Sequence, residues 1–124
     1  MDDIDISKAA DIIAQVESKG NVNSPRGDAG TAYGILQIRQ GCLTDVNRAN
    51  GTNIKLTDLE GARELSYWVF AEYMKLYART DRLGHEATLV DMGRIWNGGP
   101  NGYKRSATLH YADLVRAAEK RFYV

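Results

Sequence analysis

Glu17 is the side chain in this sequence best placed for acid chemistry. Apolar residues recur ahead of it at helical spacing and Gly20 follows it, which predicts that Glu17 lies in the last turn of a helix. The negative end of the helix dipole disfavours a charged carboxylate by a few tenths to about 1 kcal/mol, and desolvation would raise its pKa further. A carboxylic acid that stays protonated can protonate the leaving oxygen of a glycoside. A solvated surface glutamate is the alternative, and position alone favours it.

Four blocks of sequence, taken in order, carry most of the other candidates. They are Val16-Glu17-Ser18 with Gly20-Asn21, the segment 30–38 (GTAYGILQI), the segment 95–102 (IWNGGPNG), and Thr108 with Tyr111 and Val115. Together these blocks resemble soluble lytic transglycosylases, which are similar to goose-type lysozymes, and also invertebrate-type lysozymes and destabilases. The late block and Tyr73-Met74-Lys75-x-Tyr77 resemble the invertebrate family more closely. The resemblance extends from about Ile12 to Val115.

The resemblance implies a lysozyme-like fold and cleavage of the β-1,4 bond between N-acetylmuramic acid and N-acetylglucosamine in peptidoglycan. Glu17 matches the general acid of both families. Asp28 lies where invertebrate-type lysozymes carry a second catalytic carboxylate, with a one-residue gap in the spacing. We expect Asp28 to be this second catalytic carboxylate, which traps or stabilises the anomeric carbon and gives hydrolysis, with a lytic transglycosylase as the alternative. Soluble transglycosylases work without it, because the substrate's own 6-hydroxyl attacks and leaves a 1,6-anhydro sugar. An ordinary turn aspartate is the other interpretation of Asp28.

The resemblance also implies a set of substrate-binding residues. They are Ser18, Tyr33, Gly34, Gln37, Ile38, Asn97, Gly98 and Tyr111. Gln37 and Ile38 match the floor of the sugar groove, where an amide can both donate and accept. The Tyr111 hydroxyl matches one that points toward the catalytic glutamate, and Gly98 with Gly99 would let backbone groups reach the ligand. Tyr33 is equally suited to a core role.

The single cysteine, Cys42, separates this chain from the disulfide-rich invertebrate family, because one cysteine forms no intrachain disulfide. A buried or half-buried side chain is the expected state of Cys42. Helix packing must replace the missing disulfides. Trp68 and Trp96 are expected in the core. The histidines, His85 and His110, form no metal-ligand pattern, and we expect no metal and no cofactor.

Composition bounds the remaining possibilities. The 124 residues fit a single domain, and a net charge of zero argues against a nucleic-acid-binding protein. The acidic N-terminus is not typical of a signal peptide, and no apolar stretch is long enough to span a membrane. We therefore expect a monomer that is synthesised in the cytoplasm and reaches the cell wall or periplasm through holin-type release, phage delivery or another export route. Its partner would be the glycan strands of peptidoglycan.

The elements that must position these residues are mostly helical. The first helix is expected to start after Asp5 or Ser7 and to stop at Gly20. A loop that could include a short hairpin is expected to follow, up to Thr31. Residues 33–38 are expected to form either a short strand or an irregular turn in the core. A short helix is expected over 41–49.

The second half of the chain predicts three further helices. Thr57 and Glu60 have the spacing of a capping box, which predicts that the longest helix starts there and ends between 79 and 83. Helices over about 86–96 and 107–121 flank a glycine-rich turn at 97–102. The expected fold is therefore α+β and predominantly helical, with at most a small β-hairpin. A non-catalytic wall-binding or virion structural module with this fold is the remaining alternative to an enzyme.

Overall fold

A computed structural model describes the backbone of residues 3–122 and the side chains of residues 6–122. Its α-helices are α1 (Asp3–Ser18), α2 (Gln40–Asn50), α3 (Arg63–Tyr77), α4 (Thr80–Leu83), α5 (Leu89–Gly98) and α6 (Leu109–Phe122). Four 3₁₀ turns lie between them, η1 (Asp28–Gly30), η2 (Leu56–Leu59), η3 (Gly102–Lys104) and η4 (Ser106–Thr108). Within residues 3–122, β structure is limited to two isolated bridges, Gly27 with Ala32 and Tyr33 with Ile38. The described part of the domain is therefore all-α. The prediction of a predominantly helical domain is confirmed, whereas its α+β class is not.

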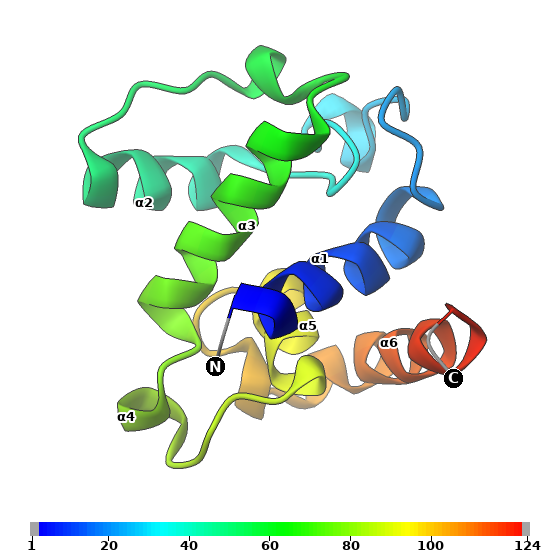
Figure 1. Ribbon diagram of the computed structural model, residues 1–124, viewed down its shortest axis with the longest axis vertical. Coiled ribbons are helices and arrows are strands. Elements are labelled where there is room, and N and C mark those ends of the chain that lie inside the picture. The colour runs from blue at the N-terminus through cyan, green and yellow to red at the C-terminus, as the bar shows by residue number, and fades with distance from the viewer. Residues whose placement is uncertain (1–2, 123–124) are drawn as a thin grey trace.

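Helix α1 is the central helix of the domain. It packs against α3 on one side and against α5 and α6 on the other, while α2 packs on α3 (Figure 1). Ala9, Ile12 and Ile13 are almost fully buried, because their spacing gives α1 a wide apolar face that both helix groups cover. Within residues 3–122, no helix is long and apolar enough to cross a membrane.

The two ends of α1 differ in how well the sequence predicted them. The helix begins at Asp3, ahead of the expected start at Asp5 or Ser7. It ends where the sequence predicts, since Lys19 and Gly20 both adopt positive φ and the Gly20 amide donates back to the Ala14 carbonyl at 3.2 Å. This ending leaves Glu17 in the last turn.

The prediction of a capping box at Thr57 was wrong. The Asp58 carboxylate accepts the Lys55 amide at 2.8 Å, which closes η2 instead of opening a long helix. Gly61, with φ of 72°, then breaks the chain before α3 begins at Arg63. Helix α3 ends at Tyr77, so α1, with 16 residues, exceeds α3, with 15. The described chain does contain a capping box, at the start of α5, where Thr88 and Asp91 exchange backbone-to-side-chain hydrogen bonds.

The glycine-rich segment after α5 is more ordered than the sequence suggested. Helix α5 includes Asn97 and Gly98, and the turn is confined to residues 99–101 before η3. Gly102 lies against the backbone of α5, where a Cβ atom would be 2.1 Å from the Arg94 carbonyl oxygen. The buried Thr108 hydroxyl holds Gly102 against α5, because it donates a hydrogen bond to the Gly102 carbonyl at 2.6 Å and accepts one from the Arg94 Nε at 2.8 Å.

Gly102→Ala is expected to destabilise the protein by about 3 kcal/mol, the upper part of the usual range for overpacking, because the clash is with helix backbone. Thermal or urea unfolding followed by circular dichroism measures the loss. Gly41→Ala is the matched control: Gly41 lies in α2, and a Cβ atom at this position would have no other atom within 4 Å, so alanine should raise stability by roughly 0.5–1 kcal/mol. Equal stabilities of the two variants would contradict the close packing of Gly102.

Candidate functional site

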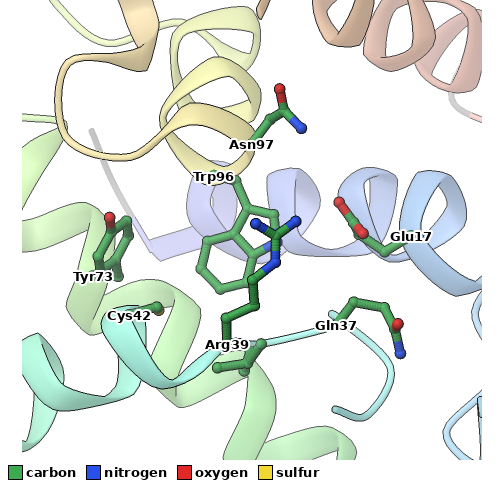
Figure 2. A pocket seen from close by; sticks show the side chains of 8 residues that line it. Glu17, Gln37, Arg39, Cys42, Tyr73, Trp96 and Asn97 are labelled. Carbon is green, nitrogen blue, oxygen red and sulfur yellow. The ribbon is translucent and has the colours of Figure 1, made fainter. Parts of the chain in front are cut away.

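A pocket opens where four distant parts of the chain meet, and Figure 2 shows the side chains that line it. Its lining consists of Glu17 from α1, Gln37, Ile38 and Arg39 from the segment before α2, Cys42 from α2, Tyr73 from α3, and Trp96 and Asn97 from α5. The structure thus brings together four residues that the sequence placed in the site: Glu17, Gln37, Ile38 and Asn97. The other four lining residues were not predicted to lie there.

Glu17 is partly buried, and its carboxylate accepts a hydrogen bond from the Tyr111 hydroxyl at 2.6 Å. Desolvation by burial raises the pKa of Glu17 above its ordinary value. The hydrogen bond from Tyr111 and the charge of Arg39 oppose this rise, and the charge of Asp28 adds to it. The net direction favours a protonated acid, which is the state that the sequence predicted for Glu17.

Tyr111 reaches Glu17 from α6, across 94 positions of sequence. It is only 6% exposed, and burial together with the adjacent Glu17 raises the pKa of its hydroxyl. The hydroxyl therefore stays protonated and acts as a hydrogen-bond donor. Because it is held between α1 and α6, Tyr111 orients the Glu17 carboxyl group toward the pocket, and this is the contact that the resemblance implied.

One wall of the pocket is aromatic. The Trp96 indole donates to the Leu36 carbonyl at 3.1 Å, and its ring packs against Phe70 and Tyr73 with centroid distances of 5.0 and 5.8 Å. Trp96 is half-buried and belongs both to the core, as predicted, and to the pocket lining. Trp68 is 36% exposed, so its predicted core position was wrong.

Cys42 lines the pocket but has little reactivity there. Burial, with a smaller contribution from the charge of Asp45, raises the pKa of the Cys42 thiol to about 12. The thiolate is the nucleophilic form of cysteine, so a thiol that stays protonated near neutral pH is not a catalytic nucleophile. The expected half-buried state of Cys42 is confirmed.

Gln37 holds the adjacent loop instead of presenting its amide to a sugar. Its Nε2 donates to the carbonyl of Gly34 at 2.9 Å and to that of Pro25 at 3.3 Å. Its Oε1 lies so close to Gly27 that a Cβ there would be 2.3 Å away. Gln37 also adopts a positive φ of 52°, a conformation that non-glycine residues seldom adopt outside strained or functional sites. The role expected for its amide in binding sugar is therefore replaced by a role in shaping the pocket edge.

Four of the predicted binding residues take part in packing around the pocket. The Ser18 hydroxyl donates to the Ile35 carbonyl at 2.6 Å and so fastens α1 to the loop. The guanidinium of Arg26 covers the Tyr33 ring at 4.4 Å. Gly34 and Gly98 allow close approach to protein atoms, since a Cβ would lie 2.7 Å from the Leu59 carbonyl oxygen and 2.5 Å from the Thr108 methyl group, respectively. These contacts explain the residue types without a ligand.

Asp28 and Arg39 form an ion pair beside the pocket. The Arg39 Nη2 lies 2.5 Å from Asp28 Oδ2, and the two side chains are 57% and 53% exposed. Arg39 extends from the segment before α2 into the pocket (Figure 2). Asp28 opens η1 with a positive φ of 49°. Sequence reasoning missed Arg39 because the recognisable block ends at Ile38; its position directly after Gln37-Ile38 was the only available signal.

Among the described side chains, no three histidine, cysteine or acidic groups lie together in a way that could hold a metal ion. His85 instead pairs with Asp91 at 2.7 Å, at the start of α5. Comparison with protein-family models, with curated proteins and with solved structures finds no match to this chain. The case for a function therefore depends on the residues of the pocket and their geometry.

Proposed function

We propose that this protein is a glycosidase that cleaves the β-1,4 bond between N-acetylmuramic acid and N-acetylglucosamine in peptidoglycan, with Glu17 as the proton donor, in a lysozyme-like domain. The observation that carries the proposal is the state of Glu17: a partly buried carboxyl group with a raised pKa, held by the Tyr111 hydroxyl at the edge of a pocket. An acid that retains its proton is what glycosidic bond cleavage requires.

The groups around Glu17 suit both of its proposed roles, first as the acid that donates a proton and then as the base that accepts one. Burial raises the pKa of Glu17 and so favours the protonated form, which donates its proton to the glycosidic oxygen as the bond to the anomeric carbon breaks. The carboxylate that remains is stabilised by the Tyr111 hydroxyl and by the charge of Arg39, both of which favour the ionised form. Glu17 can then accept a proton from the hydroxyl group that attacks the anomeric carbon.

A single catalytic carboxylate fits the site best, as in a lytic transglycosylase. Asp28 is not among the residues that line the pocket, and its carboxylate is paired with Arg39, so Glu17 is the better placed of the two carboxylates. Attack by the sugar's own 6-hydroxyl then closes a 1,6-anhydro ring. The second candidate is hydrolysis assisted by Asp28, as in a two-carboxylate lysozyme. It is favoured by one observation, namely that Asp28 is close enough for its charge to raise the pKa of Glu17.

The wall of the pocket supports a neutral sugar ligand. Trp96, Tyr73 and Asn97 offer apolar faces and an amide, which is the mixture that carbohydrate binding uses. With a net charge of zero, the chain has no long-range attraction to anionic wall polymers. Recognition would then arise from the shape of the pocket and from short-range contacts.

Mass spectrometry of purified peptidoglycan digested with the wild-type protein tests the proposal. We expect soluble muropeptides that end in 1,6-anhydro-N-acetylmuramic acid, lighter by one water than the products of hydrolysis. Products with ordinary reducing ends would establish the two-carboxylate hydrolase instead. Binding to the wall without release of fragments would overturn both candidates and leave a non-catalytic wall-binding or virion structural module.

A further inference from the structure

The Asp28–Arg39 ion pair joins a pocket-lining residue, Arg39, to the neighbouring loop that contains Asp28. Asp28 lies in a tightly built loop: its carbonyl accepts the Thr31 hydroxyl at 2.8 Å, and the Gly27 amide donates to the Ala32 carbonyl at 3.0 Å. Asp28 and Ala29 both have positive φ, a backbone conformation that non-glycine residues seldom adopt. This backbone sets the position of the Asp28 carboxylate. Arg39 lies directly before α2, as its N-cap residue. The rigid loop therefore determines where the flexible arginine side chain is held.

Stability does not explain this pair. Both side chains are more than half exposed, and ion pairs of that kind contribute little to folding because solvent screens them. The location of the pair is more informative. Arg39 lines the same pocket as Glu17, and the charges of both partners act on the Glu17 carboxyl group in opposite directions. While Asp28 and Arg39 are paired, their opposite effects on the pKa of Glu17 partly cancel. If the pair separates, the effect of the charge that lies nearer to Glu17 dominates.

We propose that Asp28 is a positioning residue that holds the Arg39 guanidinium away from the Glu17 carboxyl group, so that Asp28 contributes to the reaction through Arg39 and not through contact with the sugar. Without Asp28, the guanidinium is free to turn and pair with Glu17, which converts the proton donor into an ion-paired carboxylate. This inference rests on the proposed role of Glu17 as the acid, and it assigns the two residues that regulate its proton.

The other groups around Glu17 do not provide this control. Tyr111 from α6, Tyr73 from α3 and Cys42 from α2 are the further titratable groups that contact Glu17 or line its pocket. Burial raises the pKa of each of them, so all three are neutral near pH 7. Arg39 and Asp28 are the charged groups that act on Glu17 within the described part of the chain.

The test is a pH–rate profile for Asp28→Asn, Arg39→Gln and the double variant, measured as fragment release from purified peptidoglycan. Asparagine suits position 28 because it tolerates positive φ as aspartate does. In Asp28→Asn the pKa of Glu17 should fall, so the basic limb should move to lower pH by about one unit, and activity at a fixed pH on that limb should fall by up to roughly tenfold. In Arg39→Gln the pKa of Glu17 should rise, and the basic limb should move to higher pH.

The double variant is decisive. If Asp28 acts through Arg39, then Asp28→Asn should have no further effect once Arg39 is removed, and the double variant should show the basic limb of Arg39→Gln. A limb midway between those of the two single variants would show two independent charges and would overturn the inference. A double variant as inactive as Asp28→Asn would overturn the inference and assign Asp28 a direct role at the sugar. Loss of activity in Arg39→Gln without a shift of the basic limb would also overturn it. Asp81→Asn, which breaks an exposed ion pair with Arg79 in the separate helix α4, is the matched control and should leave the profile unchanged.

Failure of the inference and failure of the proposed function give different results. If the double variant stays inactive while Glu17→Gln is also inactive, the acid assignment stands and only the role of Asp28 is wrong. If Glu17→Gln retains activity in the wild-type background, the proposed function itself is wrong.

Discussion

Glu17→Gln is expected to lower the release of fragments from peptidoglycan by about 10²–10⁴-fold, the range that a general acid contributes. Glutamine has nearly the same shape and can still accept a hydrogen bond from Tyr111, so the pocket should keep its form. It has no proton to transfer to the glycosidic oxygen. Turbidity of a peptidoglycan suspension and mass spectrometry of the soluble products measure the loss.

The same substitution should stabilise the fold near neutral pH. The folded state raises the pKa of Glu17, so the folded protein loses stability as pH rises from the ordinary value of 4.5 through the raised value. Well below pH 4.5 the carboxyl group is neutral in both states and this penalty is absent. Glu17→Gln removes the penalty, so its advantage in unfolding temperature over wild type should grow as the pH rises from about 4 to about 8.

A surface glutamate supplies the control for both measurements. Glu64 lies exposed in the first turn of α3, and Glu64→Gln should leave fragment release unchanged. Full activity of Glu17→Gln would refute the assignment of the acid. A Glu17→Gln protein that is inactive and also less stable than wild type under mildly basic conditions would show that Glu17 is mainly a structural residue.

Phe70→Ala is expected to destabilise the protein by about 3–5 kcal/mol, which is the usual cost of truncating a fully buried phenylalanine. Phe70 has no exposed surface, and its ring packs on Trp96 at a centroid distance of 5.0 Å. Since native domains of this size are stable by only about 5–15 kcal/mol, the loss is a large part of the total. Urea unfolding followed by tryptophan fluorescence measures it and also reports on Trp96.

Trp68→Ala is the matched control, since Trp68 lies two positions earlier in the same helix but is exposed. Its truncation should cost less than about 1 kcal/mol, because exposed positions contribute little to the core. Phe70→Ala should also reduce activity at urea concentrations at which the variant is still folded. The cavity left by the phenyl ring allows Trp96 to move away from the pocket wall. Similar losses of stability in the two variants would contradict the described burial of Phe70.

The sequence predicted the helices best where local pattern and tertiary packing agree. The apolar stripe of α1 and the glycine that ends it are visible without a structure. The start of α3 was missed because the Asp58 carboxylate closes a 3₁₀ turn with the Lys55 amide, and the spacing of Thr57 and Glu60 does not reveal that competition. Residues 33–38 proved to be an irregular buried turn, one of the two structures that their composition allowed.

The candidate site was predictable only in part. Glu17, Ile38 and Asn97 could be placed by resemblance, and the structure gathers them in one pocket. Tyr73 and Cys42 reach the same pocket only because α2 and α3 pack together, and no local pattern encodes that contact. Gln37 was placed correctly but given the wrong partners, since the sequence does not show that its amide is already bonded to the loop backbone.

The contact between Tyr111 and Glu17 has a consequence for how this protein matures. Glu17 lies at the end of α1, the first helix to be synthesised, whereas the hydroxyl that orients it belongs to Tyr111 in α6. During synthesis on the ribosome, the proton donor therefore has no orienting partner until α6 has emerged and docked on α1. Partly synthesised chains would contain Glu17 without the Tyr111 hydroxyl that orients it, so the proposed activity requires that α6 has folded onto α1.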